Sequence, residues 1–134
     1  MTKQPLPPHR YIEIQLDLPP KELSPNARPH YMAKARLTKK YRATAAMLAR
    51  LKRPEEPWES ALVQTTWYFK TNRKRDRDNL LASMKAAFDG LADGGVVGDD
   101  AGFVHLPPVI EIDRERPRVV ITVSPFGGLA SERN

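Results

Sequence analysis

Residues 61–69 have the sequence ALVQTTWYF, in which β-branched and aromatic side chains recur along the whole stretch. Alternation with a period of two and an abundance of strand-forming residues are typical of a β-strand. Because the intervening positions include Leu62 and Tyr68, both faces of this strand are expected to be covered. The strand runs directly into a segment rich in Arg and Asp, so the fold and the functional residues meet here.

Periodicity and turn residues predict the elements on either side of this strand. We expect further strands at residues 11–18, 109–112 and 119–123, and helices at residues 38–52 and 78–92. Thr38 and Asp78 are the expected N-caps of these helices. The polar, turn-rich stretch that follows Pro19-Pro20 and extends to about Arg36 is expected to be a long loop. The order β-α-β-α-β-β predicts an α+β fold, a mixed sheet with helices packed on it.

The composition limits the size and setting of the protein. A chain of 134 residues with 40% hydrophobic residues buries one core, so we expect one domain over residues 1–134, with a core at about 11–123 and loose tails at 1–9 and 127–134. The absence of Cys excludes disulfides and zinc sites built from thiolates. No long apolar segment or signal-peptide pattern is present, so a soluble intracellular protein is expected.

The charge distribution favours an anionic partner. The net charge is +6 and the sequence pI about 9.8, and the excess of Lys and Arg lies in residues 1–77. Arg73, Lys74, Arg75 and Arg77 form the densest run of cations. Cations at this density suit a polyanion such as nucleic acid, although a solvated basic loop has the same composition.

Two acidic segments lie among or after these cations. Asp76 and Asp78 flank Arg77, and Asp99 and Asp100 follow Gly98. Carboxylates that converge repel one another and are stabilised by a hard divalent cation, so the pattern favours a metal site built from two segments. An Asp that caps a helix and an Asp pair that forms a turn after Gly are the structural alternatives. The spacing does not match an EF-hand, whose twelfth position would be Ala87 here.

Together, these motifs resemble a known family of nucleases. The residues that carry the resemblance are Asp76-Arg77-Asp78-Asn79-Leu80, Lys85-Ala86-Ala87-Phe88-Asp89-Gly90-Leu91, Gly98-Asp99-Asp100 and Ser24-Pro25-Asn26. Over roughly residues 11–123, the chain is similar to the RusA family of Holliday junction resolvases. One departure is that the spacing between the first two motifs is about three residues longer than is usual in that family.

The resemblance implies a site and a function. The three metal-binding aspartates of the family correspond to Asp76, Asp78 and Asp100, and its catalytic lysine corresponds by motif to Lys85, whereas strict spacing from Asp78 would place it at Ala82. The implied activity is Mg²⁺-dependent cleavage of four-way DNA junctions by a homodimer, with Mn²⁺ as a substitute for Mg²⁺. No membrane and no small-molecule cofactor is implied, and the expected setting is the nucleoid in the cytoplasm of a bacterium, for a chromosomal or phage gene.

Several assignments remain open at the level of the sequence. Arg73, Lys74, Arg75 and Arg77 are expected to hold DNA phosphates near the metal. Trp67, Tyr68 and Phe69 are expected to pack in the core rather than to stack on bases. An extension of the DNA surface and an exposed helix face are the two explanations for the basic residues Lys34, Arg36, Lys39, Lys40 and Arg42. Another metal-dependent DNA or RNA nuclease and a DNA-binding module without catalysis are the alternative functions.

Overall fold

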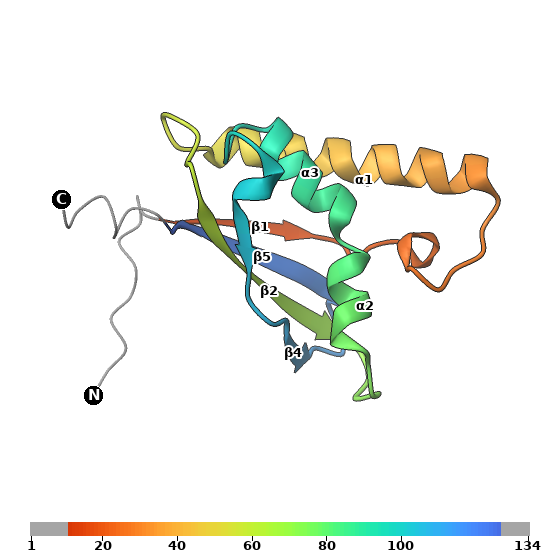
Figure 1. The fold of residues 1–134 in the computed structure, drawn as a ribbon. Helices are drawn as coiled ribbons and strands as arrows, with labels where there is room; N and C mark the ends of the chain where they lie inside the picture. The colour runs from red at the N-terminus through yellow and green to blue at the C-terminus, as the bar shows by residue number, and fades with distance from the viewer. Residues whose placement is uncertain (1–10, 127–134) are drawn as a thin grey trace, which may run out of the picture.

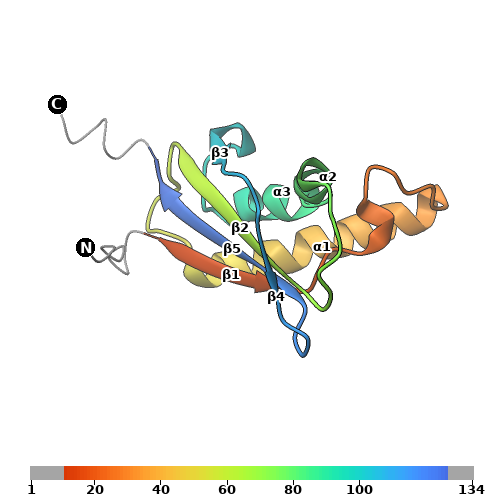
Figure 2. The same cartoon turned by 90° about the horizontal axis from the view of Figure 1, so that it is seen from below.

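A mixed β-sheet with helices packed on one face forms the core of the protein, as the computed structural model shows in Figures 1 and 2. The structure describes residues 11–126, and of Asp100 only the backbone. The strands are β1 (Ile12–Leu16), β2 (Ala61–Phe69), β3 (Phe103–His105), β4 (Val109–Ile112) and β5 (Arg118–Pro125). The helices are α1 (Tyr31–Lys52), α2 (Arg77–Ala82) and α3 (Lys85–Asp93), with short 3-10 turns at Lys21–Leu23 and Asp100–Gly102. The α+β class predicted from the sequence is confirmed.

The sheet has the order β1-β5-β2-β3, and β4 also pairs with β2. β5 runs antiparallel to both β1 and β2, whereas β3 and β4 run parallel to β2. β3 and β4 follow one another along the same edge of β2, and the ladder is interrupted between them at Pro107 and Pro108, which cannot donate hydrogen bonds. This arrangement brings the end of β4 to the end of β2, where the Arg and Asp segment begins.

The core lies between the sheet and the pair α1 and α3. Alternate residues of β2 are buried, including Val63 and Trp67, and α3 contributes Phe88 and Leu91. The intervening positions of β2 are only half-buried, so the expectation that both faces of this strand are covered is wrong. The helices lie on one side of the sheet only (Figures 1 and 2). Burial of Trp67 and Phe69 confirms their prediction as core residues.

α1 is longer than the sequence predicted. It begins at Tyr31, and Nδ1 of His30 accepts a hydrogen bond from the backbone N–H of Met32 at 3.2 Å, which caps the helix. Thr38 therefore lies inside the helix, and the expected loop up to Arg36 is wrong from Tyr31 onward. The first turns contain Met, Ala, Lys and Arg, which are strong helix formers, and this propensity outweighs the preceding turn residues.

The predicted helix at 78–92 is divided into α2 and α3. Ser83 ends α2, and its hydroxyl donates a hydrogen bond to the carbonyl of Leu80 at 2.7 Å, while Met84 leaves the helical conformation. A side chain that bonds to the backbone within the last turn competes with helix continuation. Rotational positions calculated for one continuous helix therefore do not apply across this break. β3, a strand of three residues, was also not predicted.

α3 packs closely on α1 because small residues face each other. An added Cβ at Gly90 would lie 2.4 Å from the carbonyl oxygen of Arg42 and 2.8 Å from Cβ of Ala45. Only Gly fits this position, so the α1–α3 distance is fixed by the sequence of the Lys85–Leu91 motif. The predicted tails at 1–9 and 127–134 lie outside the described residues. No helix within residues 11–126 has the length and apolar character needed to cross a lipid bilayer.

Candidate active site

Asp76 and Asp78 lie at the start of α2, directly after the loop that follows β2. Oδ1 of Asp76 accepts a hydrogen bond from the backbone N–H of Asn79 at 3.2 Å, so Asp76 is the N-cap and the assignment of Asp78 as the cap is wrong. Both side chains are exposed, and Asp78 makes no hydrogen bond or ion pair with a described residue. One oxygen of Asp76 and both oxygens of Asp78 are therefore available to a ligand.

The loop between β2 and α2 uses one of its cations to hold its own shape. The guanidinium of Arg75 lies 3.6 Å from the centre of the Phe69 ring, and one of its nitrogens donates to the carbonyl and hydroxyl oxygens of Thr71, both at 3.3 Å. Burial and, to a lesser degree, the charge of Arg73 lower the pKa of Arg75 from its usual value. Arg75 is thus engaged within the loop, whereas Arg73 and Lys74 are exposed.

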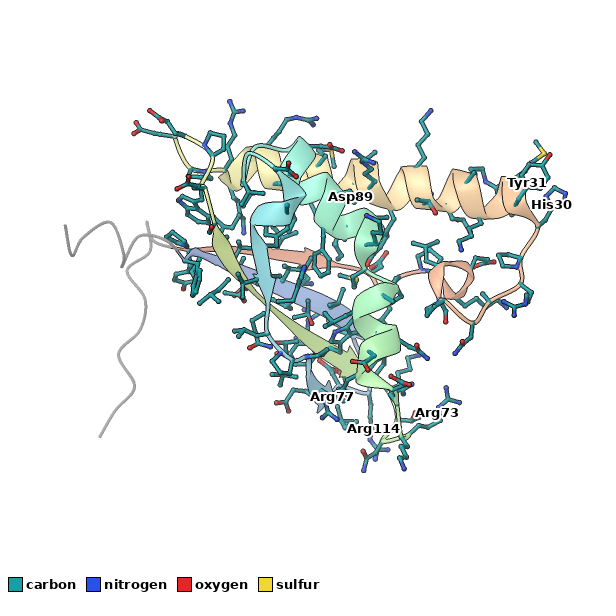
Figure 3. All side chains as sticks on the ribbon, viewed as in Figure 1. His30, Tyr31, Arg73, Arg77, Asp89 and Arg114 are labelled. Atoms are coloured by element: carbon teal, nitrogen blue, oxygen red, sulfur yellow. The ribbon has the colours of Figure 1, made fainter. Side chains whose placement is uncertain are left out.

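Arg77 joins the beginning of α2 to the sheet edge. Its Nε donates a hydrogen bond to the carbonyl oxygen of Pro108 at 3.3 Å. Pro108 directly precedes β4, so this bond connects the acidic segment with the strand that pairs alongside β2. Arg77 and Arg73 lie at the same end of the molecule in Figure 3.

Lys85 is the first residue of α3, and its ammonium group is largely exposed. The Lys85 Nζ atom lies 3.5 Å from each carboxylate oxygen of Asp89, one turn further along the helix. The Asp89 side chain is only 18% exposed and also lies 3.8 Å from Nη1 of Arg42 on α1. Lys85 and Asp89 line a pocket of about 310 Å³ whose wall includes Phe88, Phe103 and His105. The ring of His105 is 4.5 Å from that of Phe88, and partial desolvation by this contact lowers the pKa of His105, whose residue remains exposed.

The second acidic segment lies beside α3. Oδ1 of Asp99 accepts the backbone N–H of Ala101 at 3.0 Å, which shapes the turn, and Asp100 opens the 3-10 turn that contacts α3. Asp99 lines a second pocket, of about 270 Å³, together with Asp89, Asp93 and Arg42. Asp89 borders both pockets and therefore connects Lys85 with the second acidic segment.

The structure divides the predicted site residues into two groups. Asp76, Asp78 and the basic loop surround the start of α2, while Lys85 and Asp99 lie along α3. Among the side chains described, which exclude that of Asp100, no three carboxylate or imidazole groups come close enough to hold a metal ion. The donors at α2 nevertheless have the chemistry that Mg²⁺ requires, since they are exposed carboxylate oxygens beside cations that attract phosphate.

Asp89 was not among the predicted site residues, and Arg42 was named only among the basic residues that either extend the DNA surface or form an exposed face. The signal for Asp89 was present in the sequence, since Lys and Asp four residues apart on a helix face each other. Arg42 lies on a different helix, and its bidentate contact with Asp93, at 2.6 and 3.0 Å, depends on the packing of α1 on α3. That hydrogen bond is the main cause of the lowered pKa of Asp93.

Comparison with known proteins identifies the family of the chain. The sequence model of the family described as Endodeoxyribonuclease RusA matches residues 21–124, which include both acidic segments, the basic loop and Lys85. A protein of Xylella fastidiosa (strain Temecula1 / ATCC 700964), described as an uncharacterized protein, is 34% identical over 117 residues, covering 83% of this chain and 74% of its own length. The family match spans most of the sheet and all three helices, and the chain therefore belongs to the RusA family of endodeoxyribonucleases.

Proposed function

We propose that this protein is a Mg²⁺-dependent endonuclease that resolves four-way DNA junctions in recombination and repair, and that it acts as a homodimer. Membership of the RusA family supports nuclease activity on DNA. The observation that carries the finer proposal is the position of Asp76 and Asp78, exposed at the start of α2 and directly after an exposed basic loop. We take residues 11–123 as one catalytic domain.

Asp76, Asp78 and Asp100 would hold the metal, which Mn²⁺ could replace. When bound, Mg²⁺ supplies a water of lowered pKa and neutralises charge on the scissile phosphate. Asp78 is suited to this role because both of its oxygens are unengaged by described residues. Asp76 can act with one oxygen while the other continues to cap α2, so ligand binding and helix capping do not compete.

Lys85 and the loop cations would act on the phosphate itself. The Lys85 ammonium group, held near Asp89, is positioned to stabilise negative charge on the phosphate or on the leaving oxygen. Arg73 and Lys74 would hold flanking phosphates because they are exposed. Arg75 was expected to bind DNA phosphates directly. Because its guanidinium stacks on Phe69 and bonds to Thr71, it would instead stabilise the shape of the loop.

The dimer follows from the reaction. Resolution of a four-way junction requires two strands of like polarity to be cut at related positions, and each chain supplies one pair of acidic segments. Two subunits related by a twofold axis would place two sites on the two strands.

A cleavage assay tests this proposal. Purified protein is incubated with a synthetic mobile four-way junction, a linear duplex of the same sequence and a matched RNA, each with Mg²⁺ and with EDTA. Paired, Mg²⁺-dependent cuts in the junction alone are the expected result. Equal cleavage of the linear duplex or of RNA would favour a less selective nuclease. Binding of the junction without cleavage in Mg²⁺ would favour a DNA-binding module.

A further inference from the structure

The turn between β4 and β5 lies beside the basic loop that precedes α2. β4 runs parallel to β2 with Ile112 opposite Phe69, and the backbone N–H of Asp113 donates to the carbonyl oxygen of Phe69 at 2.8 Å. Both strands therefore end together, and the chain leaves each of them in the same direction. Figures 1 and 2 show the two connections side by side at this end of the sheet.

This turn is held in a defined shape by its own charged residues. Oδ1 of Asp113 accepts the backbone N–H groups of Glu115 and Arg116, at 3.0 and 3.1 Å. Its other oxygen, Oδ2, accepts a hydrogen bond from Arg118 at 2.8 Å, and the Arg118 guanidinium lies 3.9 Å from the centre of the Tyr68 ring. The hydrogen bond from Arg118 is the main cause of the lowered pKa of Asp113. Asp113 and Arg118 neutralise each other within the turn.

The remaining cations of the turn are free of this internal pairing. Arg114 is exposed, as is the side chain of Arg116, and neither side chain bonds to a described residue. The neighbouring loop has the same organisation, since Arg75 stacks on Phe69 to hold the shape while Arg73 and Lys74 are exposed. Each connection thus places one Arg on an aromatic ring of β2 and presents at least two further cations to solvent. Figure 3 shows Arg73, Arg77 and Arg114 at this one end of the molecule.

The two connections expose more cations than acids, namely Lys70, Arg73, Lys74, Arg114 and Arg116 against Asp76 and Glu115, and so form a surface suited to phosphates. Since β4 and β2 fix the distance between the connections, a phosphate chain that passes Arg73 and Lys74 would also meet the turn. A pair of flexible surface loops would lose more entropy on binding than these two connections, whose backbones are already tied down.

We infer that Arg114 and Arg116 bind DNA phosphates and form, with Arg73 and Lys74, one continuous contact surface next to the acidic residues of α2. This inference rests on the proposed function, because it assumes a DNA substrate at α2. It adds the turn between β4 and β5, which was not predicted from the sequence to contact DNA, to the proposed DNA surface. The contact would be independent of base sequence, since it involves phosphates alone.

The test is the salt dependence of binding of the double variant Arg114→Ala/Arg116→Ala. Binding to a synthetic four-way junction and to a linear duplex is measured by fluorescence anisotropy in EDTA, so that no cleavage occurs. The plot of log affinity against log salt should lose about two units of slope, and affinity at 0.1 M salt should fall on the order of tenfold or more for both DNAs. The melting temperature should be unchanged because neither side chain bonds to a described residue.

A matched control removes the same charge elsewhere. Arg50 and Arg53 are exposed near the C-terminal end of α1, away from the two connections, and Arg50→Ala/Arg53→Ala should keep the wild-type slope. An unchanged slope in the Arg114/Arg116 variant, with wild-type protein that binds and cuts junctions, would overturn the inference and leave the proposed function standing. An equal loss in the control would overturn it too, since net charge alone would then explain binding. Wild-type protein that binds no DNA would remove both proposals.

Discussion

The Nζ atom of Lys85 lies 3.5 Å from both carboxylate oxygens of Asp89, and Asp89 lies 3.8 Å from Nη1 of Arg42. Lys85 is 77% exposed, so without this partner its long side chain would sample many rotamers. Asp89 is largely buried at the α1–α3 contact and therefore provides a fixed point from a rigid part of the fold. An exposed ion pair of this kind adds little stability, so its value would lie in the position it gives the ammonium group.

Asp89→Asn should lower the cleavage rate about tenfold with little change in junction affinity, because Lys85 loses its anchor but keeps its charge. Lys85→Ala should cost on the order of a hundredfold or more, the effect of removing one group that stabilises developing charge. Single-turnover kinetics on a four-way junction measure both. Asp93→Asn is the control, since Asp93 lies on the same helix and, like Asp89, pairs with Arg42, but makes no ion pair with Lys85. Normal cleavage by Lys85→Ala would show that this lysine is only solvated surface.

Asp76→Asn, Asp78→Asn and Asp100→Asn should each abolish cleavage while junction binding stays the same or tightens. Each change removes a metal ligand and a negative charge that opposes phosphate. Asn remains a good N-cap, so Asp76→Asn should fold normally. Asp99→Asn should be milder, because Asp99 already accepts the N–H of Ala101. If Asp99→Asn is inactive and Asp100→Asn is active, the choice within this pair is wrong.

Gly90→Ala should destabilise the protein by about 1–3 kcal/mol, because the new methyl group would collide with the backbone of Arg42 and with Ala45. Urea denaturation measures the change in the free energy of unfolding. Gly98→Ala is the matched control, since an added Cβ there meets no atom within 4 Å. A Gly90→Ala protein as stable as the control would mean that α1 and α3 can separate at little cost.

The stability of the wild-type protein should decrease as pH falls below about 6.5, the ordinary pKa of an unfolded His. His105 lies on the surface, and its partial desolvation beside Phe88 lowers its pKa in the folded state, so the unfolded chain binds its proton first and protons favour unfolding. The loss should end once pH is below the folded pKa. His105→Gln should remove this component from thermal melts taken between pH 7.5 and 5. Identical pH profiles for the two proteins would contradict the prediction.

Mixing active subunits with an excess of Asp78→Asn subunits should yield dimers that nick one strand of a junction without resolving it, because only one functional site remains per dimer. Nicked and resolved products separate on native and denaturing gels. Light scattering measures the oligomeric state of the protein independently. A protein that is monomeric at micromolar concentration, and still monomeric on the junction, would exclude the homodimer and favour a simple metal-dependent nuclease.

The elements that the sequence predicted well are those with a strong local pattern. The alternation in residues 61–69 and 119–123 depends only on the two-residue period of a strand, and both strands are present as β2 and β5. Elements that depend on partners were missed. β3 has three residues and exists because it pairs with Ala61–Val63, and the helix break at Ser83 depends on one hydroxyl that bonds to the backbone.

For the candidate site, the sequence by itself determined the chemical groups: two acidic segments, a run of cations and a Lys–Asp pair four residues apart. These follow from residue identity and local spacing, and they were sufficient to identify the family. Only the tertiary structure decided which cations remain available. Arg75 and Arg118 lie over aromatic rings of β2, whereas Arg73 and Arg114 are exposed at the same end of the molecule. The reason is that a charged side chain acquires its partners from strand pairing and helix packing, which join residues far apart in the chain.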